Sequence, residues 1–215
     1  MTLFTALLAP ERAVVVADTA VGLPDDTGAF STGGHASKLA PLPHLHGLFV
    51  ARGSADLLTL AQCALLASGD DDLEVVALGL GTFLRDRLDE ADTSTVEALH
   101  PDSFNGLLVG WCPRRGSIVG FAFMDRRRPE LWGKTYDRGP FMGAAEHLDV
   151  ERVRPLATGE PTREAAIELA RMQFAELPDD QRGFGFGGHL TLAELDESGM
   201  RLELHRGFFD QRGAE

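Results

Sequence analysis

Short apolar stretches broken by turn-forming residues dominate the chain, and two of them open it. Residues 2–9 (TLFTALLA) and 13–17 (AVVVA) each have the length and composition of a strand, and the residues PER form the turn between them. The pattern predicts a hairpin. The next stretch, 22–36, is rich in Gly, Asp, Ser and Thr, which predicts a loop with at most one short strand.

The middle of the chain changes from strand to helical patterning and back again. Residues 48–54 predict a strand, and residues 56–68 and 73–88 predict two helices separated by the run GDDD. Two further apolar runs, 106–112 and 117–124, flank the sequence PRRG and predict a second hairpin.

The last third of the chain combines a helix with strands on either side. A third strand is expected near residues 131–136, and residues 159–178 predict a helix with Pro161 in its first turn. Residues 188–195 and 200–207 flank the turn DESG and predict a final hairpin.

The order of these elements favours an α+β fold. Two consecutive helices between hairpins do not fit the alternation of strand and helix that builds a parallel sheet. They suit a four-layer αββα sandwich, in which two antiparallel sheets are stacked face to face and flanked by helix pairs. No repeat and no linker composition divides residues 1–215, so we expect a single domain.

Composition excludes several classes of function. The formal net charge of the 215 residues is -13, which argues against a general nucleic-acid surface. Only two cysteines occur, Cys63 and Cys112, and they form no CxxC pair, so neither a structural zinc site nor a disulfide framework is expected. No apolar run approaches ~20 residues, so we expect no membrane span. Glu11 and Arg12 interrupt the first apolar stretch, which favours a cytoplasmic protein over a secreted one.

One basic residue stands out because arginine is used almost everywhere else. Of the 20 lysines and arginines, only Lys38 and Lys134 are lysine. The two residue types are not interchangeable, since a lysine ammonium can have its pKa lowered by its surroundings and an arginine in practice cannot. This difference draws attention to Lys38.

Four short motifs together resemble one family. They begin at Thr2, at Ala17-Asp18-Thr19, at Lys38-Leu39-Ala40-Pro41 and at Gly53-Ser54-Ala55-Asp56, and Thr2 and Asp18 are 16 positions apart. In order and near-matching spacing they resemble the proteasome β subunits, a family of N-terminal nucleophile (Ntn) hydrolases. The resemblance is specific through residue 56 and only architectural beyond it. It implies the Ntn-hydrolase fold, which is the αββα sandwich described above.

The resemblance assigns a role to four residues. It implies that Thr2 is the nucleophile, that Asp18 and Lys38 are its electrostatic partners, and that the Gly53 N–H donates to the oxyanion. A threonine hydroxyl needs a nearby base, and a free α-amino group on the same residue can be that base once Met1 is removed. A lysine near the hydroxyl lowers its pKa, and a carboxylate keeps that lysine charged and oriented.

The implied activity is cleavage of a peptide or amide bond by acyl transfer to Thr2. No metal and no organic cofactor is implied. The expected partners are a peptide or amide substrate and further copies of the chain in a homo-oligomer such as a ring. Neither nucleic acid nor membrane is an expected partner.

Two alternatives stay open because the sequence departs from the family pattern. Arg138-Gly139-Pro140 lacks the serine that the family has in this turn, and Gly183 stands where the family has an aspartate, with Asp179 and Asp180 nearby but not at the right spacing. If Met1 is retained, Thr2 has an amide nitrogen that cannot act as a base. The alternatives are a catalytically inactive structural or binding subunit with Met1 retained, and a small-molecule amidase on the same fold.

Two further patterns carry less information. His35, His44 and His46 cluster in the sequence, and HLH would put the last two on one face of a strand, but surface loop histidines explain the pattern better than a metal site. The glycine-rich stretch 183–189 lacks the context of a phosphate-binding loop, and we expect it to approach the site closely.

Overall fold

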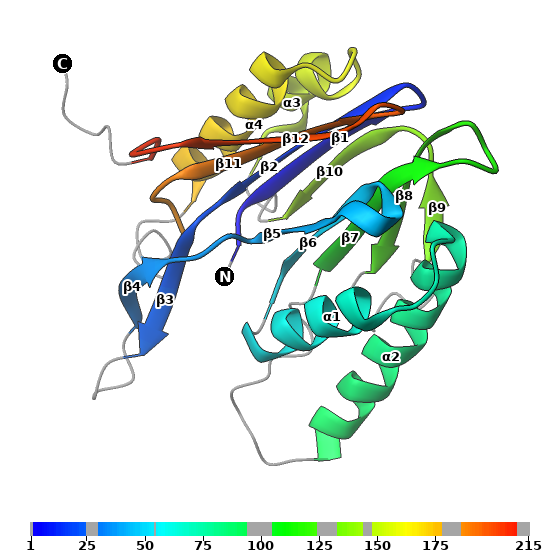
Figure 1. Cartoon of the computed structure of the whole chain (residues 1–215). Coiled ribbons are helices and arrows are strands. Elements are labelled where there is room, and N and C mark those ends of the chain that lie inside the picture. Colours follow the sequence, from blue (N-terminus) through cyan, green and yellow to red (C-terminus); the bar gives the residue numbers. More distant parts are fainter. Residues whose placement is uncertain are drawn as a thin grey trace, which may run out of the picture.

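The computed structural model describes residues 2–24, 30–53, 55–93, 105–123, 133–143, 148–177 and 186–209. These residues form an α+β structure of antiparallel sheets and helices (Figure 1). The α+β class predicted from the hydrophobic pattern is therefore confirmed.

Two five-stranded sheets make up most of the structure, and every strand pair in them is antiparallel. The first has the order β10-β1-β2-β11-β12 and comprises β1 (Phe4–Ala9), β2 (Arg12–Asp18), β10 (Gly139–Gly143), β11 (Leu190–Asp196) and β12 (Gly199–His205). The second has the order β5-β6-β7-β8-β9 and comprises β5 (Leu39–Leu42), β6 (Gly47–Arg52), β7 (Asn105–Cys112), β8 (Ser117–Phe123) and β9 (Lys134–Tyr136). The three predicted hairpins correspond to β1–β2, β7–β8 and β11–β12, and are confirmed.

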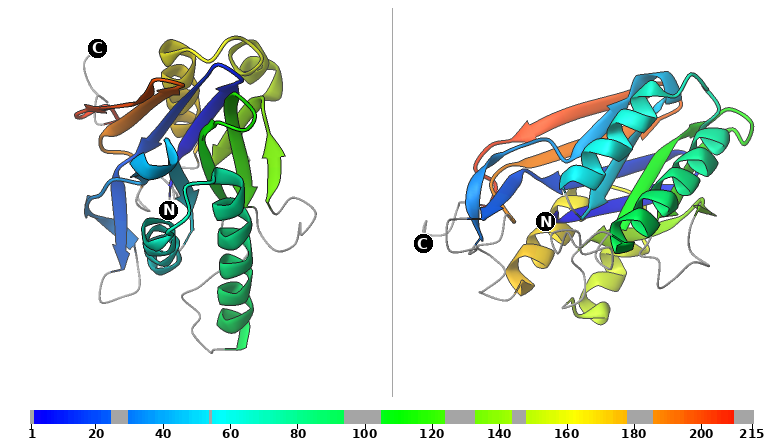
Figure 2. Two further views of the ribbon diagram at one scale, coloured as in Figure 1. Left: turned by 45° about the vertical axis from the view of Figure 1, so that its right-hand side comes forward. Right: turned by 90° about the horizontal axis from the view of Figure 1, so that it is seen from below.

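Helices cover the two sheets on opposite sides. The helices α3 (Val150–Ala157) and α4 (Arg163–Glu176) pack against the first sheet, and α1 (Ala55–Ala67) and α2 (Leu73–Thr93) pack against the second (Figure 1; Figure 2 adds views from two other directions). None of the described helices is both long and apolar enough to cross a membrane.

The central strand β2 shows why the opening of the chain is continuously apolar. Val14 and Val16 pack toward α3 and α4, whereas Val15 packs into a third hydrophobic cluster that lies between the two sheets. All three side chains are fully buried. A strand that is buried on both faces has no polar side to present, so its sequence reads as an unbroken apolar run.

Several predicted elements differ from the structure at their ends and in number. Residues 22–36 contain the end of β3 (Ala20–Pro24) and all of β4 (Phe30–His35). The two strands pair as a separate small sheet, where a loop with at most one short strand was expected. The prediction was wrong because glycine and serine in Phe30–His35 mask the strand pattern. The single helix expected over 159–178 is the shorter α4, with α3 before it.

Two local predictions were also wrong. Pro161 precedes the N-cap Thr162 of α4 and therefore lies outside its first turn. His44 and His46 do not share a strand face, since Pro43–Leu45 form a 3₁₀ turn and His46 has a positive φ of 43°. Pro43 favours such a turn because its ring fixes φ near the helical value.

Helix α4 is anchored to the first sheet by a buried glutamine. The side chain of Gln173 is 1% exposed, and its Nε2 donates hydrogen bonds to the backbone oxygens of Gly143 at 2.7 Å and Phe4 at 3.2 Å. The hydroxyl of Thr5, which is also buried, donates to Gln173 Oε1. One side chain thus bonds to buried polar groups on both β1 and β10.

We expect Gln173→Leu to lower the free energy of unfolding by about 2–4 kcal/mol, because it leaves a hydroxyl and two carbonyl groups buried without this partner. Adding Thr5→Val to Gln173→Leu should recover part of the loss, since the double variant no longer buries the orphaned hydroxyl. Urea denaturation measures both changes. A loss below about 0.5 kcal/mol for Gln173→Leu would contradict this account of the α4 anchor.

Candidate functional site

The candidate site begins at Asp18, the last residue of the central strand β2. Its carboxylate is fully buried and accepts two backbone hydrogen bonds: the Leu3 N–H donates to Oδ1 and the Gly187 N–H donates to Oδ2, each at 2.9 Å. The Asp18 N–H in turn donates to the Leu3 oxygen at 3.0 Å. Asp18 therefore fixes the position of the chain directly after Thr2.

Lys38, which directly precedes β5 of the second sheet, supplies a third donor. Its Nζ lies 2.8 Å from Asp18 Oδ1, and the side chains of Lys38 and Asp18 are 7% and 0% exposed. The segment that carries Lys38 runs from β4 to β5, and the Ala36 N–H holds it to the Thr19 oxygen at 2.8 Å. Because β2 and β5 belong to different sheets, this ion pair joins the two sheets.

Thr2 is buried and directly precedes Leu3, whose backbone bonds to Asp18. It is 1% exposed, and its Oγ1 has no hydrogen-bonding partner among the described residues. A buried hydroxyl without a partner costs stability, so it calls for an explanation other than folding. Its neighbour Leu3 is the residue whose backbone bonds to Asp18 in both directions.

Gly53 directly follows β6, which is the neighbour of β5 in the second sheet. The register pairs Leu39 with Val50, so continuing it by one step puts Lys38 opposite Ala51, two residues before Gly53. Gly53 has a φ of 152°, at the margin of the region that favours glycine, and it is half-buried. The strand order thus brings Gly53 to the same end of the sheet as Lys38.

Burial dominates the electrostatics of the ion pair. It raises the pKa of the Asp18 carboxyl and lowers the pKa of the Lys38 ammonium, because each charged form loses its hydration. Their mutual attraction and hydrogen bond oppose both shifts, and the N–H groups of Gly187 and Leu3 also favour the charged carboxylate. Each ion therefore depends on the other to remain charged.

The direction of each pKa shift determines the pH range in which that group contributes to stability. For Asp18, whose pKa is raised, the contribution to stability is complete below the ordinary value of 3.8 and is lost as pH rises through the raised pKa. For Lys38, whose pKa is lowered, the contribution is present above 10.5 and is lost as pH falls through the lowered pKa. Between these limits the charged pair costs stability.

We expect Lys38→Met to become less stable as pH rises from about 5 to about 8, with a slope of up to about 1.4 kcal/mol per pH unit. Without the ammonium, the pKa of Asp18 rises further, so folding must retain a proton that the solvent increasingly removes. Urea denaturation at several pH values measures the slope. The exposed Lys134 is the matched control: Lys134→Met should follow the wild type. Equal slopes for Lys38→Met and wild type would refute the coupling.

The structure also locates the remaining residues considered from the sequence. His35 stacks on His189, at 4.5 Å between ring centroids, and the described residues contain no group of three or more His, Cys, Asp or Glu side chains arranged to hold a metal ion. Gly139 opens β10 with a φ of 131°. Asp179, Asp180 and Gly183 lie outside the described residues.

Two contributors to the site were not identified from the sequence as individual residues. The stretch 183–189 was expected to approach the site, and its residue Gly187 does contact Asp18, but nothing in the glycine-rich pattern marks which N–H group donates. Thr19 belonged to the motif Ala17-Asp18-Thr19 but was assigned no role from the sequence. Its Oγ1 accepts a hydrogen bond from the His189 N–H at 3.0 Å, which ties the strand exit to the same segment.

Comparison of the sequence with models of protein families finds no match. Comparison with curated proteins also finds none that matches. The geometry of Asp18, Lys38 and Thr2 is therefore the basis for any functional assignment.

Proposed function

We propose that the chain has the four-layer αββα sandwich of the Ntn hydrolases and acts as an N-terminal threonine hydrolase of proteasome β type. The observation that carries the proposal is the buried Lys38–Asp18 pair, whose carboxylate also bonds to the residue after Thr2. A buried ion pair is a costly way to stabilise a fold, which favours a role in chemistry. The unpartnered hydroxyl of Thr2 supports the same role.

The proposed reaction requires cleavage of the bond before Thr2. The freed α-amine takes the hydroxyl proton as Oγ1 attacks the substrate carbonyl, and the Lys38 ammonium favours the developing alkoxide. The Gly53 N–H donates to the oxyanion of the tetrahedral intermediate. Collapse of the intermediate breaks the C–N bond, and the leaving amine takes the proton from the α-ammonium. Water then hydrolyses the ester on Thr2, which releases the acid and restores the hydroxyl.

The substrate under this proposal is a peptide or another amide. Assembly into a homo-oligomer such as a ring remains a prediction from the resemblance. A cytoplasmic location remains a prediction from the composition and the N-terminal sequence. The proposal invokes no metal and no organic cofactor, because the α-amine, Lys38 and Gly53 supply the base, the cation and the oxyanion donor.

One observation favours a second candidate, a catalytically silent structural subunit. Thr2 is 1% exposed, so its hydroxyl is not accessible to a substrate in this structure, in which the bond before Thr2 is intact. A protein that never cuts this bond would keep the αββα framework and the ion pair without turnover.

A peptide epoxyketone separates the two candidates. The Thr2 hydroxyl adds to the ketone and the α-amine opens the epoxide, so the adduct mass is the sum of the two molecules with no leaving group. We expect stoichiometric addition that peptide mapping assigns to Thr2, and none after Thr2→Ala. An absence of adduct on a chain proven to begin at Thr2 would exclude the hydrolase and favour the silent subunit.

A further inference from the structure

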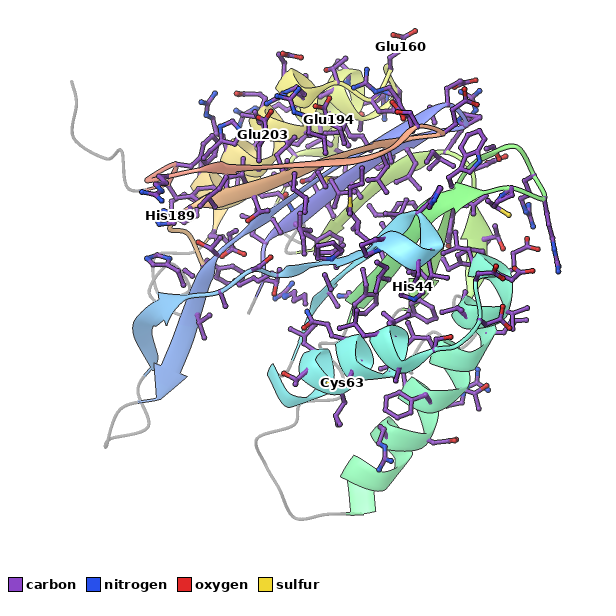
Figure 3. All side chains as sticks on the ribbon, in the orientation of Figure 1. His44, Cys63, Glu160, His189, Glu194 and Glu203 are labelled. Atoms are coloured by element: carbon purple, nitrogen blue, oxygen red, sulfur yellow. The ribbon has the colours of Figure 1, made fainter. Side chains whose placement is uncertain are left out.

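Two histidines from distant parts of the chain stack against each other next to Asp18 in the fold. His35 ends β4 and His189 immediately precedes β11, and their ring centroids lie 4.5 Å apart with an interplanar angle of 11°. Figure 3 labels His189 where the chain turns into β11, close to the β3–β4 sheet. His35 is exposed and His189 is half-buried, so solvent protons reach the pair.

The hydrogen bonds define the protonation state of His189. The Gly207 N–H donates to His189 Nδ1 at 2.9 Å, so this nitrogen carries no proton and the neutral ring bears its proton on Nε2. The His189 N–H donates to Thr19 Oγ1, which also lies 3.2 Å from His35 Nδ1. A single hydroxyl on the residue after Asp18 thus connects both histidines.

The segment 187–189 lies between this histidine pair and Asp18. The Gly187 N–H bonds to Asp18 Oδ2, and its oxygen accepts from the Thr19 and Ala20 N–H groups at 3.3 and 3.1 Å. Gly188 has a φ of 74°, and a Cβ there would come within 2.5 Å of His35 Cε1. The backbone is therefore in close contact with the His35 ring on one side and bonded to Asp18 on the other.

The charged surroundings do not favour two protonated rings. Asp18 is already paired with Lys38, and His205 Nε2 lies 3.7 Å from Glu203 Oε2. Further charged groups on described elements near the segment are mostly cationic. They are Arg206, directly after β12, Arg52, which lies over the Phe186 ring, and Arg171 of α4, which lies over the Phe208 ring and 3.6 Å from Glu168.

We propose that His35 and His189 are positioning residues that hold segment 187–189 against Asp18 only while both rings are neutral. Protonation of His189 at Nδ1 would set a donor against the Gly207 N–H and break that bond. Protonation of both rings would put two like charges in stacked contact. Either change loosens the segment and withdraws the Gly187 N–H from Asp18. The consequence for turnover rests on the proposed function, whereas the consequence for the Gly187 amide does not.

Amide hydrogen exchange followed by NMR tests the proposal on the full chain. We expect the protection factor of the Gly187 amide to fall at least about tenfold between about pH 7.5 and about pH 5.5, the range in which imidazoles take up protons. His189→Asn should remove this fall, because Asn Oδ1 can accept from Gly207 in place of Nδ1 but takes up no proton. His44→Asn, at an exposed histidine of the 3₁₀ turn, should leave the fall unchanged.

A second variant keeps the test decisive if His189→Asn does not fold. His35→Asn removes one of the two stacked charges from an exposed position, so the fall should be smaller than in wild type. A pH-independent protection factor in the wild type, or an equal fall in wild type and in every folded histidine variant, would overturn the proposal. If the protection factor behaves as expected but no pH gives turnover, the histidine pair stands and the proposed hydrolase fails.

Turnover supplies a further readout if the hydrolase is active. The decrease in kcat toward acidic pH should be less steep in His189→Asn than in wild type, because protonation of His189 no longer adds to protonation of the α-amine. An equal decrease in kcat toward acidic pH in the two proteins would contradict the proposal that the histidine pair holds segment 187–189 against Asp18.

Discussion

Thr2→Val should lose at least about 10³-fold in turnover while keeping or raising the free energy of unfolding. The side chains of valine and threonine have nearly the same shape, so the change removes the hydroxyl without opening a cavity. Since Thr2 Oγ1 is buried and has no partner among the described residues, its removal breaks no known hydrogen bond. Replacing such a hydroxyl by a methyl group should leave the free energy of unfolding unchanged or raise it by up to about 1–3 kcal/mol.

Thr5→Val, three residues further along in β1, is the matched control. Thr5 is as buried as Thr2, but its hydroxyl donates to Gln173, so this variant should lose stability and retain turnover. Thr2→Ser, which keeps a hydroxyl, should retain measurable activity. Hydrolysis of fluorogenic peptides and urea denaturation measure the two properties. Retention by Thr2→Val of more than about a tenth of wild-type turnover would rule out Thr2 as the nucleophile.

Asp18→Asn should lower the free energy of unfolding by about 3–5 kcal/mol, because it leaves the buried Lys38 ammonium without its counter-ion. An asparagine also has only one side-chain oxygen, so it cannot accept from Leu3, Gly187 and Lys38 as the carboxylate does. Turnover should fall as well, since the same change mispositions Lys38.

A surface ion pair provides the comparison for Asp18→Asn. Arg152 and Glu176 are 3.0 Å apart with 60% and 41% of their side chains exposed, and Glu176→Gln should cost less than about 1 kcal/mol. Combining Asp18→Asn with Lys38→Met should recover part of the loss, because no unpaired ion is then buried. Urea denaturation measures all four proteins, and equal costs for Asp18→Asn and Glu176→Gln would show that the buried pair has no special role.

The strands that were predicted well are those whose environment leaves a simple pattern. In β2 the run Ala13 to Ala17 is buried on both faces, and in β7 and β8 the apolar runs flank a clear turn. The edge strands β5 and β10 were missed, since each contains a proline, Pro41 and Pro140, that is tolerated only where one side of the strand is unpaired. Helix α3 was missed because Pro155 interrupts it.

The candidate site was predictable only in part, for a physical reason. The proximity of Asp18 and Lys38 was expected through the motifs that resemble a family, and the two side chains do meet at 2.8 Å. The Gly187 N–H and the His35–His189 stack were not predictable, because both depend on where β11 enters the sheet beside β2. Local sequence encodes a strand far better than it encodes the strand's neighbour in the sheet.

The identity of the first residue of the mature protein tests the central claim most directly. The α-amine of Thr2 can act as a base only if the preceding bond is cut, and otherwise that nitrogen is an amide. Intact mass and N-terminal peptide mapping of the protein purified from its own host give the answer. The hydrolase account predicts a chain that begins at Thr2, and a mature chain that begins at Met1 or at any other residue would contradict it.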